Sequence, residues 1–151
     1  MWSIKLLRRL FTYIDDRLME AVDVGNLTAV KTYIGKGANI HIKNDYALRW
    51  AARKGHLDVV KHLIESGANI HAENDYALRY AANNGHLEVV KYLIESGVDI
   101  HAWGDRALRY ATYYGHLQVA NVLRKAAGNK YKCHRCIIRS TCLEICEDFR
   151  K

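Results

Sequence analysis

"DYALRWAARKGHLDVVKHLIESGANIHAEN" occupies residues 45–74, and residues 75–104 read "DYALRYAANNGHLEVVKYLIESGVDIHAWG". The two stretches agree at about two-thirds of their positions. The same thirty-residue step separates the members of two series of glycines, which are Gly25, Gly55, Gly85 and Gly115, and Gly37, Gly67 and Gly97. A fixed period of this length is the signature of a repeat protein, in which each unit stacks on its neighbours.

The period divides most of the chain into four units, which are residues 15–44, 45–74, 75–104 and 105–127. In the second unit, Asp45 is in position to cap a short helix, and Gly55 is expected to end that helix in the left-handed conformation. A second helix should begin near Leu57 and end at Gly67. The spacing of its apolar residues predicts one buried face, made of Leu57, Val60, Leu63 and Ile64. The last residues of the unit, "ANIHAEN", are expected to be short and extended.

Helices of two or three turns do not persist alone, so the units must bury their apolar faces against one another. Half of the 151 residues are apolar and proline is absent, which leaves glycine to end the elements. The sequence therefore predicts an all-α solenoid of about four helix-turn-helix units. We expect a helical cap at each end, from residues 1–14 and residues 128–151.

The shared pattern "AA..GHL.VVK.LIE.GANI" resembles the ankyrin repeat, and the resemblance covers residues 15–127. The thirty-residue step and the opening "DYALR" are most similar to the short repeats of ankyrin proteins from giant DNA viruses. The resemblance implies a rigid module without catalytic activity that binds a partner protein in its concave groove. For the viral members it also implies that the partner is a host protein.

Two features of the chain differ from the usual ankyrin unit of about 33 residues. The missing residues fall between Ile70 and Tyr76, so the hairpin that joins neighbouring repeats should be shortened. The usual Thr-Pro-Leu-His opening is replaced by Tyr46-Ala47-Leu48-Arg49. We expect a pairing between Asp45 and Arg49, four residues apart on a helix, to replace the lost threonine–histidine hydrogen bond.

Positions that change between repeats are the candidate binding residues, because the constant positions hold the stack together. By the resemblance to ankyrin proteins, the changing columns line the groove, which would run from basic through amide to aromatic character. The predicted partner-binding residues are Lys43, Trp50, Arg53, Lys54, Glu73, Tyr80, Asn83, Asn84, Trp103, Tyr110, Tyr113 and Tyr114. Tyrosine, tryptophan and arginine are the residues that most often anchor protein interfaces.

An alternative for three of the rings is that they pack beneath the C-terminal segment and close the stack, as terminal repeats often do. These rings are Trp103, Tyr113 and Tyr114. The histidines recur at equivalent positions, which favours structural hydrogen bonds over metal binding. They form two series, His56, His86 and His116, and His41, His71 and His101. The recurring arginines Arg49, Arg79 and Arg109 are expected to form a ladder with Asp45, Asp75 and Asp105.

The first fourteen residues, "MWSIKLLRRLFTYI", have the spacing of a basic amphipathic helix. Their apolar side is formed by Ile4, Leu7, Phe11 and Ile14. Such a helix can lie on an anionic membrane or act as a targeting signal. We expect it to cap the first repeat, because it runs without interruption into Asp15.

The four cysteines all lie in "CHRCIIRSTCLEIC", as Cys133, Cys136, Cys142 and Cys146. Four thiolates can hold zinc, but only five residues separate the two pairs, where a zinc fold usually has a dozen or more. We expect buried thiols that pack as small apolar groups, with zinc binding and a disulfide as the alternatives.

The net charge of +7 is divided between basic ends and an acidic middle. Lys and Arg minus Asp and Glu give 10 minus 5 in residues 1–54, 3 minus 7 in residues 55–104, and 10 minus 4 in residues 105–151. This distribution argues against a continuous track for nucleic acid. The prediction is a monomeric module that binds another protein, and the alternative is contact of the basic ends with a membrane or nucleic acid.

The sequence contains no phosphate-binding loop, HExxH pair or nucleophile elbow. We therefore expect neither catalytic activity nor a cofactor. No secretory signal or stretch of about 20 apolar residues is present, so the expected location is intracellular, by default the cytoplasm.

Overall fold

The computed structural model describes the backbone of residues 2–128 and the side chains of residues 13–128. Every element in this part of the chain is a helix, which confirms the predicted all-α class. The helices are α1 (Trp2–Asp23), α2 (Leu27–Gly35), α3 (Ile42–Lys54), α4 (Leu57–Glu65), α5 (Ala72–Asn83), α6 (Leu87–Glu95), α7 (Ala102–Tyr113) and α8 (Leu117–Ala126).

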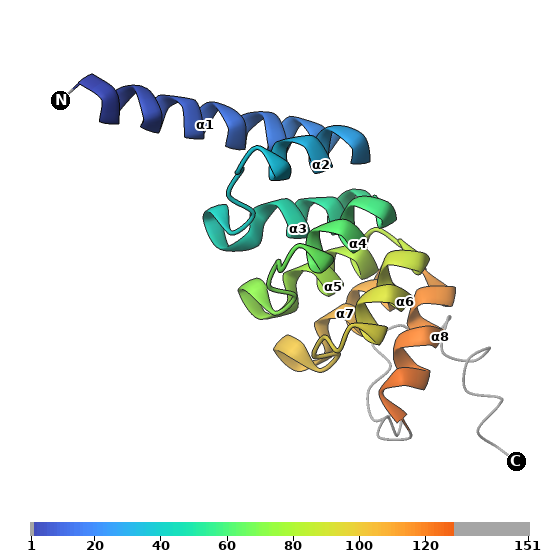
Figure 1. The fold of residues 1–151 in the computed structure, drawn as a ribbon. Coiled ribbons are helices and arrows are strands. Elements are labelled where there is room, and N and C mark those ends of the chain that lie inside the picture. Colours follow the sequence, from blue (N-terminus) through green and yellow to red (C-terminus); the bar gives the residue numbers. More distant parts are fainter. Residues whose placement is uncertain (1, 129–151) are drawn as a thin grey trace, which may run out of the picture.

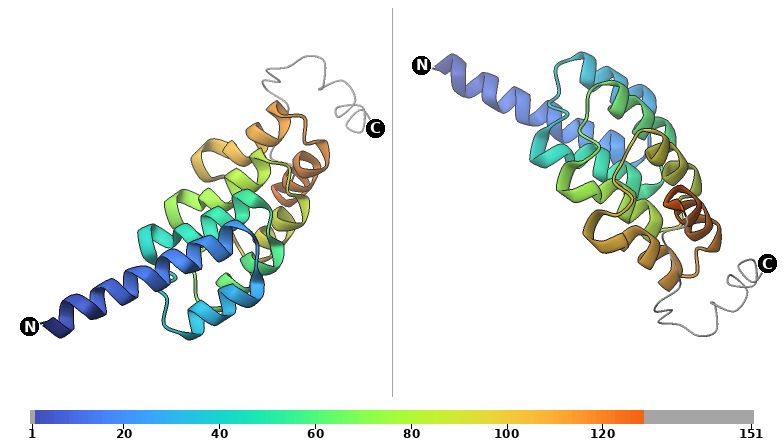
Figure 2. Two further views of the ribbon diagram at one scale, coloured as in Figure 1. Left: turned by 90° about the horizontal axis from the view of Figure 1, so that it is seen from above. Right: turned by 90° about the horizontal axis from the view of Figure 1, so that it is seen from below.

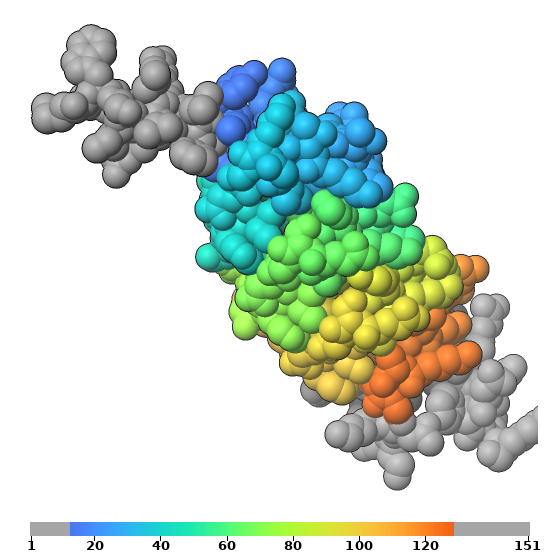
Figure 3. Space-filling view, viewed as in Figure 1, coloured from blue at the N-terminus to red at the C-terminus, as the bar shows by residue number. Residues whose placement is uncertain are grey.

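The helices pack in two layers (Figures 1 and 2). The odd-numbered helices α1, α3, α5 and α7 contact one another in chain order, and α2, α4, α6 and α8 form the second layer. Each odd helix also packs on the even helix that follows it. In the space-filling view, successive repeats form bands along the length of the molecule (Figure 3).

The long helix α1 runs through Asp15 without a break, and its N-terminal part continues past the stack (Figures 1 and 2). Ile14 is partly buried against the core, as the predicted apolar side requires. The side chains of residues 1–12 and all of residues 129–151 lie outside the described part. Capping by the two ends therefore stays a prediction, as do the three interpretations of the cysteines.

The core follows the predicted helical spacing. Leu48, Ala51 and Ala52 of α3 are fully buried, as are Val60 and Leu63 of α4. Small alanines on the inner side of α3 allow close packing of neighbouring helices, while each fully buried leucine contributes about 1.5–3 kcal/mol of apolar burial. The helix boundaries near Gly55 and Leu57 also match the prediction, and Gly55 has the expected positive φ of 81°.

The expectation of an extended tail in each unit is wrong. Residues 70–71 form a turn, and the three residues Lys43, Asn44 and Asp45 all have left-handed backbone angles, with φ of 50°, 57° and 54°. The same left-handed triplet recurs at residues 73–75 and 103–105. Asn, Asp and Gly tolerate this region best, and they occupy two of the three positions each time. The repeats are thus joined by a compact turn, and no strand occurs within residues 2–128.

Asp45 does not cap its own helix, so this part of the prediction is also wrong. Its carboxylate oxygen Oδ1 accepts the Nδ1–H of His41 at 2.9 Å and the backbone N–H of Asn69 at 3.0 Å. Asp45 has left-handed backbone angles, whereas a residue that caps the start of a helix normally has extended ones. Asp75 is bound in the same way to His71 and to the backbone N–H of Asp99.

The arginine column does not pair with these aspartates, contrary to the expected ladder. Arg49 donates from Nε to the carbonyl of Asn44 at 2.9 Å and from Nη2 to the carbonyl of Lys43 at 2.7 Å. Arg79 binds the next turn in the same way. Arg49 and Arg79 therefore satisfy the carbonyls of the left-handed turns, a structure that costs about 1–2 kcal/mol per residue.

The structural interpretation of the histidines is confirmed. His86 Nε2 donates to the carbonyl of Arg53 in the preceding repeat at 2.9 Å, and His56 and His116 make the equivalent bonds. The imidazole of His86 lies so close to Gly55 that a Cβ at that position would be 2.5 Å from His86 Nδ1. Glycine is therefore required at Gly55 both for its positive φ and for this contact.

Candidate protein-interaction surface

The predicted binding residues lie on one layer of the fold, on α3, α5 and α7 and at the two residues that directly follow α5 and α7, Asn84 and Tyr114. Because these helices pack side by side in chain order, each predicted column runs across consecutive repeats. We call this the first-helix face. It consists of Lys43, Trp50, Arg53, Lys54, Glu73, Tyr80, Asn83, Asn84, Trp103, Tyr110, Tyr113 and Tyr114, together with Asp23 at its N-terminal edge.

The basic end of this face is a compact cluster around Trp50. The Arg53 guanidinium lies 4.9 Å from the centre of the Trp50 ring and 5.6 Å from that of Tyr80 on the next helix. Lys54 Nζ lies 2.9 Å from Asp23 Oδ1, and the Trp50 Nε1–H donates to the same oxygen at 2.7 Å. The hydrogen bonds from Lys54 and then Trp50 lower the pKa of the Asp23 carboxyl.

The middle of the face is formed by amides and stacked tyrosines. The rings of Tyr76 and Tyr80 stack with centres 3.9 Å apart. Burial, followed by a hydrogen bond with Tyr80, raises the pKa of Tyr76, while the charges of Arg53 and Arg49 act in the opposite direction. The side-chain amide of Asn84 donates to the Tyr80 carbonyl at 2.8 Å, and Asn84 is exposed on the surface.

The aromatic end contains three large rings that are more than half exposed. The exposed fractions are 56% for Trp103, 69% for Tyr113 and 54% for Tyr114. Tyr113 and Tyr114 contact edge to face at 4.9 Å, and Tyr110 lies next to them. Tyr110, Tyr113 and Tyr114 therefore form one cluster at the C-terminal end of α7. Trp103 lies at the other end of this helix, and Arg106 contacts both its ring and that of Tyr110.

The comparison with known families agrees with this architecture. A family model described as "Ankyrin repeats (3 copies)" matches residues 18–103 and residues 48–134, which together span more than half of the chain. The chain belongs to the ankyrin repeat family. Ankyrin repeats generally mediate protein–protein interaction and are typically non-catalytic. A search of curated proteins found no significant match.

Sequence reasoning missed several contributors to this ankyrin surface. The rings of Tyr46, Tyr76 and Trp103 alternate across three repeats with the guanidinium groups of Arg49, Arg79 and Arg106. Each guanidinium carbon lies 5.0–5.4 Å from the centre of a neighbouring ring. Cation–π contacts of this kind contribute about 0.5–2 kcal/mol each. The three-residue spacing of Tyr46 and Arg49 on one helix was the signal that could have revealed the series.

Asp23 was also missed, although it holds both Lys54 and Trp50. It belongs to the first ankyrin repeat, and the corresponding positions in the next two repeats are Arg53 and Asn83. Because an aspartate does not recur at this position, the repeat pattern did not indicate its role. Its contacts come from the packing of α1 against α3, which a reading of one unit cannot show.

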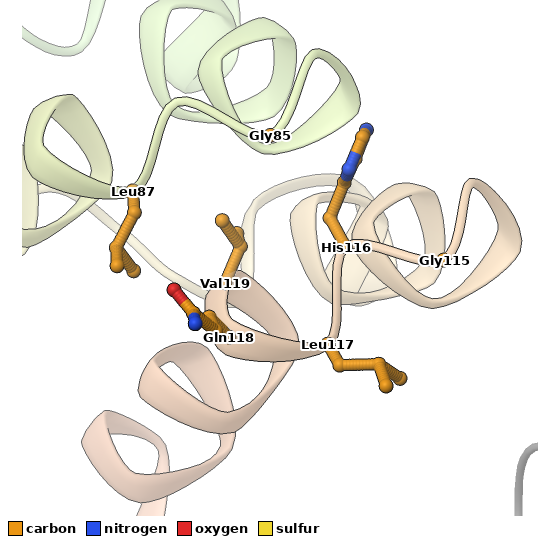
Figure 4. Close-up of a pocket in the computed structure, with 7 residues that line it drawn as sticks. All are labelled: Gly85, Leu87, Gly115, His116, Leu117, Gln118 and Val119. Carbon is orange, nitrogen blue, oxygen red and sulfur yellow. The ribbon is translucent and has the colours of Figure 1, made fainter.

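A shallow depression of about 400 Å³ lies at the turn before α8, lined by Gly85, Leu87, Gly115, His116, Leu117, Gln118 and Val119 (Figure 4). Within the described residues, no three His, Cys, Asp or Glu side chains are grouped so that they could hold a metal ion. None of the described helices is long and apolar enough to span a membrane.

Proposed function

We propose that this ankyrin repeat protein binds a partner protein through the first-helix face. The observation that carries the proposal is the exposed cluster of Tyr113 and Tyr114 at the end of α7, with Trp103 exposed at the start of the same helix, since large rings held at a surface are typical anchors of protein interfaces. The cluster adjoins a series of arginines already held against rings, so the face is ordered before a partner arrives. Preordered side chains reduce the entropic cost of binding.

The chemistry of the face suggests a polarised partner. Along consecutive repeats the same position changes from Arg53-Lys54 to Asn83-Asn84 and then to Tyr113-Tyr114. A segment with an acidic end and an apolar end would match this order in one direction only. The similarity of the repeats to those of viral ankyrin proteins makes a host protein the partner to search for first.

The test is affinity capture from a cell lysate with the intact protein and two variants. One variant carries Arg53→Ala, Lys54→Ala, Tyr113→Ala and Tyr114→Ala. The matched control carries four alanines on exposed positions of the second layer, at Asp58, Glu65, Glu88 and Glu95. Circular dichroism spectra and melting curves establish that both variants remain folded.

A partner retained by the intact protein and the control, but lost by the first variant, supports the proposal. Equal recovery from all three proteins contradicts it and moves the function to the basic ends, which is the membrane or nucleic-acid alternative. Binding of the intact protein to anionic vesicles or to an oligonucleotide, with a strong dependence on salt, identifies which of these applies.

A further inference from the structure

Arg53 differs from the other arginines of α3 and α5 in what its guanidinium contacts. Arg49 and Arg79 direct Nε and Nη2 to backbone carbonyls of the left-handed turns, at distances of 2.7–3.1 Å. Arg53 is exposed and lies over the rings of Trp50 and Tyr80. Within residues 13–128, no hydrogen-bond acceptor is paired with it. Its planar set of N–H donors therefore remains available to a ligand.

The two rings hold the Arg53 side chain from two different helices, α3 and α5. Contact with a ring occupies the face of a guanidinium, while the hydrogen-bond donors lie in its plane. The rings thus fix the position of the group without using its donors. Trp50 is itself fixed, because its Nε1–H is bound to Asp23 at 2.7 Å.

We propose that Arg53 binds the carboxylate of an aspartate or glutamate side chain of the partner protein. The proposal rests on the function proposed above and names the chemistry that the basic end recognises. A guanidinium matches a carboxylate through two parallel N–H···O hydrogen bonds, which a lysine cannot supply. The neighbouring Lys54 is already paired with Asp23 at 2.9 Å, so it adds positive potential but fewer free donors.

A carboxylate suits this site better than the phosphates of a nucleic acid. The Asp23 carboxylate lies 2.9 Å from Lys54, the cation next to Arg53 in the chain, and so partly neutralises it. A continuous row of phosphates would meet this negative charge, whereas a single carboxylate needs only the Arg53 guanidinium. Affinity for nucleic acid requires several neutralised phosphates.

The position of the aromatic cluster sets the spacing within the partner segment. Arg53 is on α3, and Tyr113 is on α7, two helices away. Packed helices lie about 8–10 Å apart, so the two sites are separated by about 16–20 Å. An extended chain rises by about 3.3 Å per residue. We therefore expect the acidic residue to lie about five to six positions from a large apolar or aromatic residue.

The experiment uses a displayed library of random twelve-residue peptides, selected on the full-length protein. The expected selection is an acidic residue and an aromatic or large aliphatic residue at the stated spacing. Selection on Arg53→Gln should lose the acidic residue and retain the apolar one. Selection on the Tyr113→Ala, Tyr114→Ala protein should lose the apolar residue and retain the acidic one. The control is Lys125→Gln, an equal change of charge on α8, which should select the same peptides as the unaltered protein.

Affinities of the best peptide then test the pairing directly. Arg53→Gln should weaken binding roughly ten- to hundred-fold, and Glu→Gln or Asp→Asn in the peptide should weaken it equally. The two changes together should cost no more than either alone, because they remove the same contact. Arg53→Lys retains the charge but should still weaken binding, since the paired donors are lost.

Three results would overturn the assignment to Arg53. The first is selection of peptides without an acidic residue, and the second is an acidic preference that is unchanged in both Arg53 variants. The third is binding of a twenty-nucleotide oligothymidylate that is tighter than binding of the best peptide and is lost in Arg53→Gln. The first two leave the proposed interaction face intact if the tyrosine variant still changes the selection. The failure of every protein to select any peptide would instead contradict the proposed function together with this inference.

Discussion

The carboxylate of Asp45 binds the backbone N–H of Asn69, twenty-four residues later, at 3.0 Å. This bond joins the start of the first helix of a repeat to the turn that follows its second helix. Asp15 binds the N–H of Asn39 and Asp75 binds that of Asp99 over the same separation. Each of these aspartates is nearly buried, so hydrogen bonds as well as apolar packing hold the two helices of each repeat together.

Replacement of Asp45 by alanine should lower the free energy of unfolding by about 2–4 kcal/mol. The change removes two hydrogen bonds and leaves the Asn69 N–H without its acceptor in a partly buried position. Urea unfolding followed by circular dichroism measures the effect. The matched control is Asp16→Ala, at an exposed position of α1, which should change stability by less than about 0.5 kcal/mol. Equal effects of the two substitutions would refute this role of Asp45.

Two glycines should respond to alanine in opposite directions. At Gly55, a Cβ would lie 2.5 Å from His86 Nδ1 and the backbone φ is 81°, so Gly55→Ala should destabilise by about 1–3 kcal/mol. At Gly35, within α2, a Cβ meets nothing within 4 Å, and alanine should stabilise by about 0.5–1 kcal/mol. Thermal melting of both variants tests the pair, and stabilisation by Gly55→Ala would show that His86 moves freely.

Replacement of Arg79 and replacement of Arg53 by alanine should have different effects on the free energy of unfolding. Arg79 is 7% exposed and satisfies two carbonyls of a left-handed turn, so Arg79→Ala should destabilise by about 2–4 kcal/mol. Arg53→Ala should cost about 1 kcal/mol or less, because only its ring contacts are lost. Chemical denaturation of both variants provides the measurement. A large loss for Arg53→Ala would show that this residue serves the fold.

The pKa of Asp23 should respond to its partner on α3. The hydrogen bonds from Lys54 and Trp50 hold this pKa below its ordinary value of 3.8. A carboxyl with a lowered pKa stabilises the folded state above the ordinary value, and the contribution is lost as the pH falls through the folded value. Carboxyl chemical shifts recorded by NMR during an acid titration should show the low pKa, and Lys54→Met should raise it. An identical titration curve in Lys54→Met would exclude the ion pair in solution.

Much of the fold could be predicted because the apolar spacing that defines the helices lies within a single unit, and the period shows that this unit repeats. The ends of the helices near Gly55 and Leu57 follow from glycine and from the pattern of buried residues, both of which are local signals. The layer that carries the candidate binding residues was also predictable, since equivalent positions of stacked units must form columns. The binding role of those residues stays a prediction.

The turns could not be predicted because their stability comes from residues outside them. Nothing in "IHAEN" indicates three left-handed residues, and the carbonyls they expose are satisfied by Arg79 of the following helix. The sequence favours helix capping for Asp45, because that is the commonest role of aspartate at such a position. Its partners were instead His41 on one side and Asn69 on the other, a choice that only the stacked structure reveals.

The regular spacing of these bonds has a consequence for how such a gene can change. Residues 45–74 and 75–104 make the same contacts with the units on either side, which include the Gly–His contact and the hydrogen bond from the preceding histidine to the aspartate. Unequal recombination that adds or removes one block of thirty codons would therefore join ends that already fit. The stack could gain or lose a whole unit in a single genetic event, and each new length would bring a different order of side chains to its surface.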